Sequence, residues 1–355
     1  MMASPPSWSP PDLHAAAPEP ADFALVGVDY LRLSSKPIFD GANGIIYKGS
    51  DAANTKVVVI KTVKKQKSQS DSLYYRSVMR EYSNLKKCAA SKSVVDVYAI
   101  ATTKDSPELS LIIQFCPVGD LLDYLCRLRT KKISMPSNLK DAVFKQIVKA
   151  VDFLHRHDIA HRDIKPENFL IDGNGFLKLN DFGCSLDLTQ MDEQLPLNDI
   201  HCGTPSFKSP ELYQVENDIH SGKEPDIAHM DFKMVDVWAL GILCFQLFLL
   251  SVPWPHANAT ADEKNIVIDK YIRHYPESEK DLVSLANKLN DRNFSSSSNP
   301  ALSVFKKLHY EARLESFRML NPVPSKRDTT ESLLRSAWLS QAYADPKELL
   351  KLLPK

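Results

Sequence analysis

The sequence HRDIKPEN at residues 161–168, followed by DFG at residues 181–183, decides how this chain is interpreted. The first stretch places a carboxylate, a lysine and an amide within eight residues, and the second adds a carboxylate beside a glycine. Phosphoryl transfer needs a group that orients a hydroxyl, a cation for the moving phosphate and oxygen ligands for Mg²⁺. Either stretch alone is a weak sign, because short motifs also occur by chance in turns. Together, at this spacing, they predict a phosphoryl-transfer site.

The segments around this motif predict how its two carboxylates meet. Residues 138–157 repeat apolar side chains at helical spacing, which predicts an amphipathic helix that leads into His161. Residues 169–171 and 176–179 are apolar and flank Asp-Gly-Asn-Gly, which predicts a two-stranded hairpin. Asp163 and Asp181 lie at the two ends of this hairpin segment, so both are expected to face one cleft.

The first hundred residues are rich in strand signals. Residues 38–48 read as strand, glycine turn and strand, and Gly41 and Gly44 would let backbone N–H groups approach phosphates, although an ordinary hairpin explains them equally well. Residues 57–61, VVVIK, predict a strand that ends in Lys61, which by itself is as readily a solvated lysine. Residues 75–87 have helical spacing, and Glu81 follows Lys61 by 20 residues.

These features resemble the eukaryotic protein kinase superfamily. KPEN at 165–168 and GTP at 203–205 are similar to its serine/threonine type, SPE at 209–211 stands where the family usually has Ala-Pro-Glu, and Glu211 would pair with Arg327. The resemblance implies an α+β, bilobal fold with a small β-rich N-lobe, one main helix there, and a larger, mostly helical C-lobe. It implies a kinase domain at 23–342, divided into an N-lobe at 23–113, a hinge at 114–119 and a C-lobe at 120–342, between tails at 1–22 and 343–355.

The resemblance also assigns roles to individual residues. Asp163 would orient the substrate hydroxyl, Lys165 would stabilise the transferring phosphate, and Asn168 and Asp181 would bind Mg²⁺. Lys61, paired with Glu81, would hold the phosphates of ATP. The remaining expected nucleotide contacts are Gly41, Gly44, Ile46, Val59, Gln114, Cys116 and Leu170. The implied activity is ATP- and Mg²⁺-dependent phosphorylation of serine or threonine in protein substrates, and Asp120 and Glu167 suggest a preference for basic residues upstream of the target.

Two departures from the family pattern leave questions open. Phe39 replaces the first glycine of the phosphate loop, which favours a pseudokinase scaffold as the alternative, although none of the expected catalytic residues is missing. A small-molecule kinase is disfavoured by the GTP and SPE segments. Ile200 stands where the activation loop usually carries its phosphorylated residue, so Asp199 or Glu193 is expected to pair with Arg162 instead, with Thr189 and Ser185 as alternative phosphorylation sites.

Composition adds weaker expectations. The net charge is formally zero, which gives no sign of a nucleic-acid or membrane-surface protein, and the apolar run at 238–252 is shorter than a membrane span. The six cysteines lack CxxC spacing, so free thiols in a reducing compartment are expected. Cys184 and Cys202 would lie near the cleft, where a redox switch is the alternative. The proline-rich residues 1–22 predict a disordered tail, and 215–231 and 279–300 predict solvated loops. We therefore expect an intracellular, cytoplasmic or nuclear protein without a membrane span, and a monomer.

Overall fold

The computed structural model describes residues 23–104, 106–190, 200, 202–227, 229–259 and 266–353. These residues form two compact units. The first comprises the described residues up to Ala90 together with Val95–Phe115, and the second comprises Ser91–Val94 and the chain from Cys116 onward. The change after Phe115 falls inside the predicted hinge at 114–119. No sequence pattern indicates that residues 91–94 belong to the second unit, where the N–H of Leu179 donates to the carbonyl oxygen of Ser93 at 2.8 Å.

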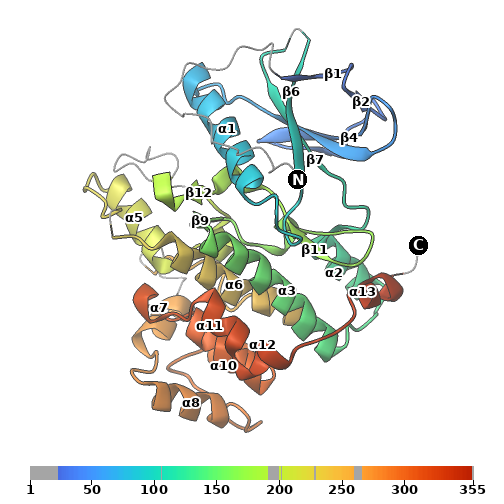
Figure 1. The fold of residues 1–355 in the computed structure, drawn as a ribbon. Helices are drawn as coiled ribbons and strands as arrows, with labels where there is room; N and C mark the ends of the chain where they lie inside the picture. Colours follow the sequence, from blue (N-terminus) through green and yellow to red (C-terminus); the bar gives the residue numbers. More distant parts are fainter. Residues whose placement is uncertain are drawn as a thin grey trace, which may run out of the picture. The chain divides into compact units, whose positions relative to one another are not determined.

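A seven-stranded sheet dominates the first unit, in the order β2-β1-β6-β7-β5-β4-β3 (Figure 1). Its strands are β1 (Ala24–Val26), β2 (Tyr30–Arg32), β3 (Phe39–Asp40), β4 (Gly44–Asp51), β5 (Val57–Val63), β6 (Val97–Thr103) and β7 (Leu109–Gln114). Side chains alternate between the two faces of β5. Val58 and Ile60 are fully buried and pack with Ile112 of β7 in one apolar cluster. Lys61 therefore lies on the opposite face of the sheet.

The helix α1 (Asp71–Lys87) belongs to the same unit as this sheet. Ser70 begins it, because its hydroxyl accepts the N–H of Leu73 and so satisfies a backbone donor that the first turn leaves free. The predicted apolar face is present, with Val78 and Leu85 each 1% exposed. This helix supplies Glu81 to the site.

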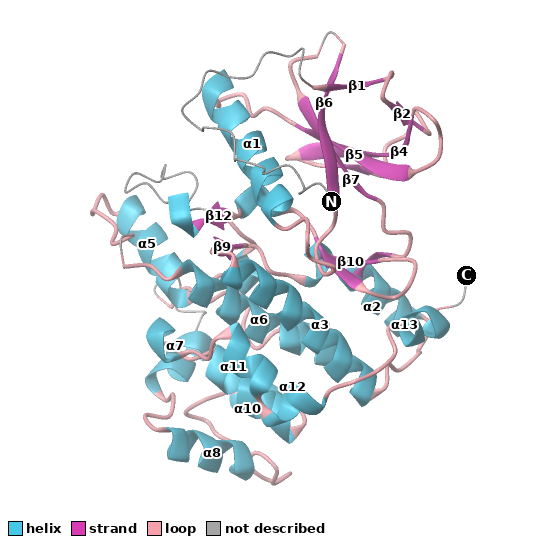
Figure 2. Ribbon diagram, in the orientation of Figure 1, coloured by secondary structure: helices cyan, strands magenta, loops and turns pink. Residues whose placement is uncertain are grey.

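The second unit is mostly helical, with small two- and three-stranded sheets (Figure 2). Its helices are α2 (Leu121–Thr130), α3 (Ser137–Arg156), α5 (Pro210–His220), α6 (Phe232–Leu249), α7 (Ile266–Arg273), α8 (Glu279–Lys288), α9 (Leu302–Phe305), α10 (Tyr310–Met319), α11 (Thr330–Arg335), α12 (Ala337–Gln341) and α13 (Lys347–Leu352). Its strands are β8 (Gly119–Asp120), β9 (Ile159–Ala160), β10 (Phe169–Ile171), β11 (Leu177–Leu179) and β12 (Leu186–Asp187). The α+β fold class predicted from sequence is confirmed.

Helix α6 forms the centre of the second unit. Within the described residues it is the one helix long and apolar enough to cross a membrane, but 78% of it is buried inside the protein. It packs against α3 and α10. Burial on all sides explains why the helix is apolar around its whole circumference.

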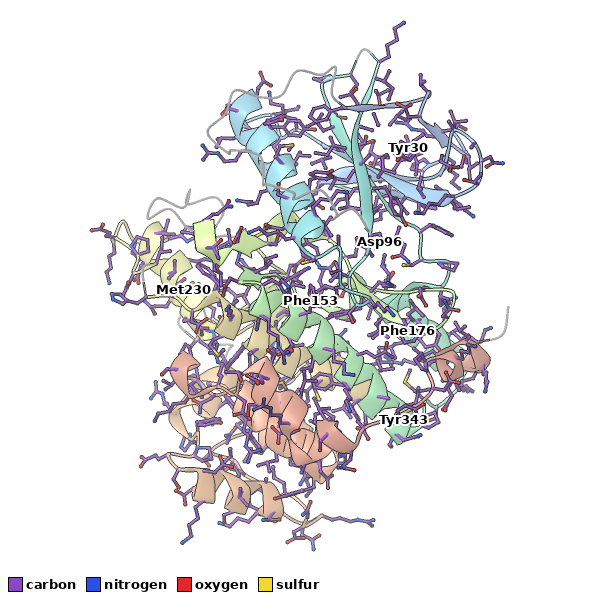
Figure 3. All side chains as sticks on the ribbon, in the orientation of Figure 1. Tyr30, Asp96, Phe153, Phe176, Met230 and Tyr343 are labelled. Atoms are coloured by element: carbon purple, nitrogen blue, oxygen red, sulfur yellow. A yellow bond between two sulfur atoms is a disulfide. The ribbon has the colours of Figure 1, made fainter. Side chains whose placement is uncertain are left out.

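Two segments differ from the loops that the sequence predicted. Residues 215–220 continue α5, and residues 279–288 form α8, in which Ser278 caps the first turn by accepting the N–H of Asp281. The C-terminal tail docks through α13: the hydroxyl of Tyr124 donates to the carbonyl oxygen of Leu349 at 2.6 Å, and the side chain of Leu349 is fully buried. Tyr343, in the segment that leads to α13, is 82% exposed (Figure 3).

Candidate active site

A buried carboxylate on α6 fixes the backbone of the HRD loop, the segment at residues 161–168. Asp236 is fully buried, and it accepts the backbone N–H of His161 at 2.8 Å and of Arg162 at 2.7 Å. The same carboxylate lies 3.0 Å from Nε2 of His155 on α3. Arg162 adopts a positive φ of 64°, a conformation that persists only where the surroundings impose it. Asp236 thus holds the residue before Asp163 in a conformation that the chain would not adopt alone.

The side chains of the predicted catalytic residues bond to one another. Oδ2 of Asp163 is 2.8 Å from Nζ of Lys165 and accepts from Nδ2 of Asn168 at 3.1 Å. Oδ1 of Asp163 accepts both the N–H and the hydroxyl of Thr204, at 3.0 and 2.8 Å. Nζ of Lys165 also donates to the hydroxyl of Thr204 at 2.8 Å. The Asp163 carboxylate thus accepts from Lys165, Asn168 and Thr204 together, and these contacts fix its orientation.

The residues expected to bind a divalent cation carry suitable oxygen atoms. Nδ2 of Asn168 donates to the carbonyl oxygen and to Oδ2 of Asp163, so the amide oxygen of Asn168 is the atom left for a hard cation. Asp181 follows β11 at a φ of 59°, and the fully buried Phe182 beside it packs edge-on against His161 with ring centroids 5.1 Å apart. No group of three His, Cys, Asp or Glu that could hold a metal occurs among the described residues. One amide and one carboxylate fit Mg²⁺, which takes few protein ligands and completes its shell with water and phosphate oxygens.

The ion pair expected in the first unit is present. Nζ of Lys61 lies 2.7 Å from Oε1 of Glu81, and the two side chains are 12% and 6% exposed. Lys61 lies in β5, where it pairs with Ile46 of β4 on one side and with Leu111 of β7 on the other, so its backbone position is fixed on both sides. The ion pair with Glu81 and the strand pairing together fix the position of the Lys61 ammonium group on this face of the sheet.

The glycine turn between β3 and β4 is held close by its neighbours. The ring of Phe39 lies over Gly41, where an added Cβ would come within 2.5 Å of a ring carbon, and an added Cβ at Gly44 would meet the carbonyl oxygen of Thr62 at 2.6 Å. Nζ of Lys64 donates to the carbonyl oxygen of Gly41 at 3.0 Å and pairs with Asp40 at 2.6 Å. The aromatic residue at the first glycine position thus covers the turn, and Lys64 fastens it.

The other expected nucleotide contacts belong to both units. Ile46, the buried Val59 and Gln114 lie in the first unit, on β4, β5 and β7. The buried Cys116 and Leu170 of β10 lie in the second unit. Asp96 exchanges contacts with Gln114: its carbonyl oxygen accepts the N–H of Gln114 at 2.9 Å, and its own N–H donates to Oε1 of Gln114 at 3.3 Å.

The expectation of free thiols is wrong at two positions. Cys184 and Cys202 form a disulfide with a Cα–Cα distance of 5.7 Å, which spacing along the chain could not reveal because the two residues are 18 apart. The other cysteines, Cys88, Cys116, Cys126 and Cys244, are free. The disulfide brings together the residue after DFG and the residue before Gly203.

The pairing of an acidic residue with Arg162 stays a prediction. Asp199 and Glu193 lie outside the described residues. Nε of Arg162 donates to the carbonyl oxygen of Cys184 at 2.7 Å, and Ile200 is fully buried. Ser185 is also fully buried, with its hydroxyl bonded to the carbonyl oxygen of Phe182, which makes it a poor phosphorylation site, whereas Thr189 is exposed.

The predicted ion pair between Glu211 and Arg327 is present. Glu211 accepts from Arg327 at 2.6 and 2.8 Å in a bidentate pair, and the guanidinium also donates to the carbonyl oxygens of Met234 and Asn321. The Arg327 side chain is fully buried and lies over the ring of Trp238. This pair ties the beginning of α5 to α6 and to the segment that precedes α11.

Sequence reasoning missed Thr204 as a partner of Asp163. Thr204 sits in the GTP stretch, whose resemblance indicated the serine/threonine type but gave no individual contact. Residues 236–241 resemble the helix that anchors the catalytic loop in the family, and the structure shows that the Asp236 carboxylate makes the contact. A carboxylate buried without partners would be costly, so its position alone indicates bonded donors nearby.

The protein kinase domain family matches residues 34–339 of this chain. Among similar curated proteins are the serine/threonine-protein kinase chk1 of Schizosaccharomyces pombe (29% identity; 58% of this chain, 38% of the relative) and the maternal embryonic leucine zipper kinase of Xenopus tropicalis (27%; 82% and 36%). The liver/testis phosphorylase b kinase gamma catalytic chain of Bos taurus is 33% identical (52% and 44%). The chain thus spans less than half the length of these relatives. A family match across most of the chain, with the HRD and DFG geometry described above, shows that this chain belongs to the protein kinase domain family.

Proposed function

We propose that this protein is a serine/threonine kinase that transfers the γ-phosphoryl group of ATP to hydroxyl groups of protein substrates. The observation that carries the proposal is the network around Asp163, in which Lys165, Asn168 and Thr204 all donate to one carboxylate. Such a network orients a proton acceptor and places a cation beside it, which is what transfer to an alcohol needs. The names of the similar curated kinases agree with this activity.

The reaction follows from these positions. Asp163 accepts the proton of the substrate hydroxyl, whose oxygen bonds to the γ-phosphorus while the bond from that phosphorus to ADP breaks and ADP leaves with the electron pair. Lys165, 2.8 Å from Asp163, supplies positive charge to the transferring group. Mg²⁺, which the family generally uses, would be held by Asn168 and Asp181 and would neutralise phosphate charge.

The family resemblance assigns nucleotide contacts to residues of both units. Lys61, oriented by Glu81, would bind the α and β phosphates, and the turn at Gly41 and Gly44 would cover them. The adenine ring would take the apolar side chains of Ile46, Val59 and Leu170 and backbone groups of Gln114 and Cys116. These roles follow the family resemblance.

The preference for a basic residue upstream of the target rests mainly on Glu167. Its side chain is exposed, whereas Asp120 already accepts the N–H of Asp123 as the cap of α2, which leaves less of its charge for a substrate. We therefore place the stronger attraction for lysine or arginine at Glu167. A monomer that works inside the cell, in the cytoplasm or nucleus, completes the proposal.

Radiolabelled phosphate transfer from Mg-ATP to a library of serine and threonine peptides tests the proposal. Wild type should label peptides, and Asp163→Asn should not. Asp123→Asn serves as the matched control, because Asp123 forms an exposed ion pair with Arg127 on α2 and lies outside the network. Nucleotide binding without transfer in wild type would replace the kinase with a nucleotide-binding scaffold.

A further inference from the structure

The disulfide joins two short segments that both touch the HRD loop. Cys184 follows Phe182 and Gly183, and its carbonyl oxygen accepts from Nε of Arg162 at 2.7 Å. Cys202 precedes Gly203, which lies so close to the backbone of Arg162 that an added Cβ would come within 2.7 Å of its carbonyl oxygen. The disulfide therefore joins two residues that flank Arg162. The carbonyl oxygen of Cys184 accepts from its side chain, and Cys202 precedes the glycine that lies against its backbone.

The segment that follows Cys202 reaches the proton acceptor directly. Thr204, two residues after Cys202, bonds Oδ1 of Asp163 through its N–H and its hydroxyl. Gly203 has a φ of 100°, which an L side chain rarely adopts, so the approach of this segment depends on that glycine. Any force that holds Cys202 in place also limits how far Thr204 can move from Asp163.

Near the two ends of the segment, Ser185 and Ile200 offer no accessible hydroxyl for phosphorylation, whereas Thr189 is exposed. Ile200 is fully buried and packs in an apolar cluster with Leu186 and Leu212, and Ser185 is fully buried as well. A phosphate at position 200 has no hydroxyl to carry it. The apolar cluster and the disulfide are the two observed devices that join the beginning of the segment to its end.

We propose that the Cys184–Cys202 disulfide is a reversible covalent modification that holds the Thr204 segment against the HRD loop and thereby strengthens binding of the protein substrate. The inference rests on the kinase activity proposed above. Closing a loop of this length removes freedom that the open segment would otherwise have, so the bound arrangement gains in population. A phosphate paired with an arginine orders this segment in many kinases, and here the covalent bond would take that part.

The modification needs an oxidant and a reductant of common classes. A hydroperoxide oxidises one thiol to a sulfenic acid and is itself reduced to water or an alcohol. The second thiol then attacks the sulfenic sulfur, the S–S bond forms, and water leaves. A dithiol reverses the bond by exchange, returning two thiols and becoming a disulfide itself.

The position of these two cysteines favours them over the others as the reactive pair. Cys184 and Cys202 are both partly exposed, so reagents can reach them. Cys88 and Cys244 are buried, and burial raises the pKa of each thiol to about 12, which keeps them unreactive. Cys126, exposed and free on α2, is a matched control because it is open to the same reagents.

The bond itself is tested by peptide mapping of the full chain after treatment with hydrogen peroxide and, separately, with dithiothreitol. A cross-linked peptide containing Cys184 and Cys202 should appear with the oxidant and disappear with the dithiol. Hydrogen exchange at the amide of Thr204, which donates to Asp163, should be slower in the oxidised chain. An oxidised chain without this cross-link, or with unchanged exchange at Thr204, would overturn the inference whatever the activity.

The consequence is tested by kinetics on the same two samples. If the reduced segment is in place about a tenth of the time, the KM for a peptide substrate should rise about tenfold on reduction while the KM for ATP stays the same. Cys184→Ser and Cys202→Ser should show the high KM in both conditions, and Cys126→Ser should respond like wild type. An equal peptide KM in oxidised and reduced wild type refutes the regulation without recourse to any variant. Absence of transfer in both samples, together with a redox-dependent exchange at Thr204, would refute the kinase proposal and leave the clamp standing.

Discussion

Replacing Asp236 by asparagine should weaken both the fold and the catalytic loop. The carboxylate receives two backbone N–H groups and lies against His155, all at 2.7–3.0 Å and away from water. Asparagine keeps one oxygen and turns an NH₂ group toward these donors, so at least one buried donor loses its partner. An orphaned donor costs roughly 1–3 kcal/mol and the lost charge adds about 1 kcal/mol, so we expect the free energy of unfolding to fall by about 3 kcal/mol. That corresponds to a Tm lower by about 6–12 °C.

The same change should reduce phosphate transfer by more than the loss of folded protein explains. Arg162 holds a positive φ that costs about 1–3 kcal/mol, and without the carboxylate its backbone is free to relax. Asp163 is the next residue, and a displacement of about 1 Å at such a group can cost about a hundredfold in rate. We would measure kcat at a temperature where circular dichroism shows the variant folded.

A matched control lies on the same helix. Asp231 caps α6 by accepting the N–H groups of Lys233 and Met234, and asparagine is an equally good cap. Asp231→Asn should therefore change the unfolding free energy by less than about 0.5 kcal/mol and leave kcat unchanged. If Asp236→Asn behaved like this control in both assays, the anchoring role of Asp236 would be refuted.

Three further predictions concern single contacts. Lys61→Met should abolish transfer and destabilise the protein by about 3 kcal/mol, because the buried Glu81 carboxylate would lose its ion pair with Lys61. Adding Glu81→Gln should restore the free energy of unfolding but not transfer. Arg327→Lys should lower the unfolding free energy by about 3 kcal/mol in urea titration, since lysine cannot replace the bidentate pair with Glu211 or the backbone contacts, and a loss under about 1 kcal/mol would contradict this. Burial raises the pKa of Glu315 from 4.5 to about 7, so between these pH values the folded state keeps a proton that the unfolded state loses. The free energy of unfolding should therefore fall as pH rises from about 4.5 to 7, by up to about 3 kcal/mol. Glu315→Gln should remove this dependence in urea titrations across that range.

The local parts of the fold were predictable because their signals are local. The helix at 138–157 is α3 at Ser137–Arg156, and the hairpin around residues 172–175 pairs Phe169 with Leu179 as expected. Apolar periodicity and turn residues act over a few positions, so they survive without knowledge of the rest of the chain. The loop at 279–300 was misjudged in part because the charged residues of α8 lie on its exposed face, where polarity gives no sign of a helix. In the loop at 215–231, Glu216 is instead buried on α5 and pairs with Lys208 at 2.6 Å, a contact that its polarity did not reveal.

Contacts between distant segments divide according to whether the family resemblance specifies them. The resemblance paired Lys61 with Glu81, and the structure brings their side chains to 2.7 Å. Thr204 and Asp163 are 41 residues apart, and nothing in either stretch alone specifies that a hydroxyl and an N–H will meet one oxygen. Such a contact is set by the packing of the second unit as a whole.

The disulfide shows why a residue's environment can reverse an inference from its type. Six cysteines without CxxC spacing indicated free thiols, and for Cys88 and Cys244 burial in the core makes that inference sound. Cys184 and Cys202 differ because the HRD loop fixes the chain on both sides of them: Arg162 binds the carbonyl oxygen of one, and Asp163 binds the residue two positions after the other. The contacts that prepare the catalytic loop thus also bring the two sulfur atoms together. It follows that the thiol pair and the catalytic carboxylate are coupled in both directions: a substitution that removes the hydroxyl bond of Thr204 to Asp163, such as Thr204→Val, should also slow formation of the cross-link in peroxide.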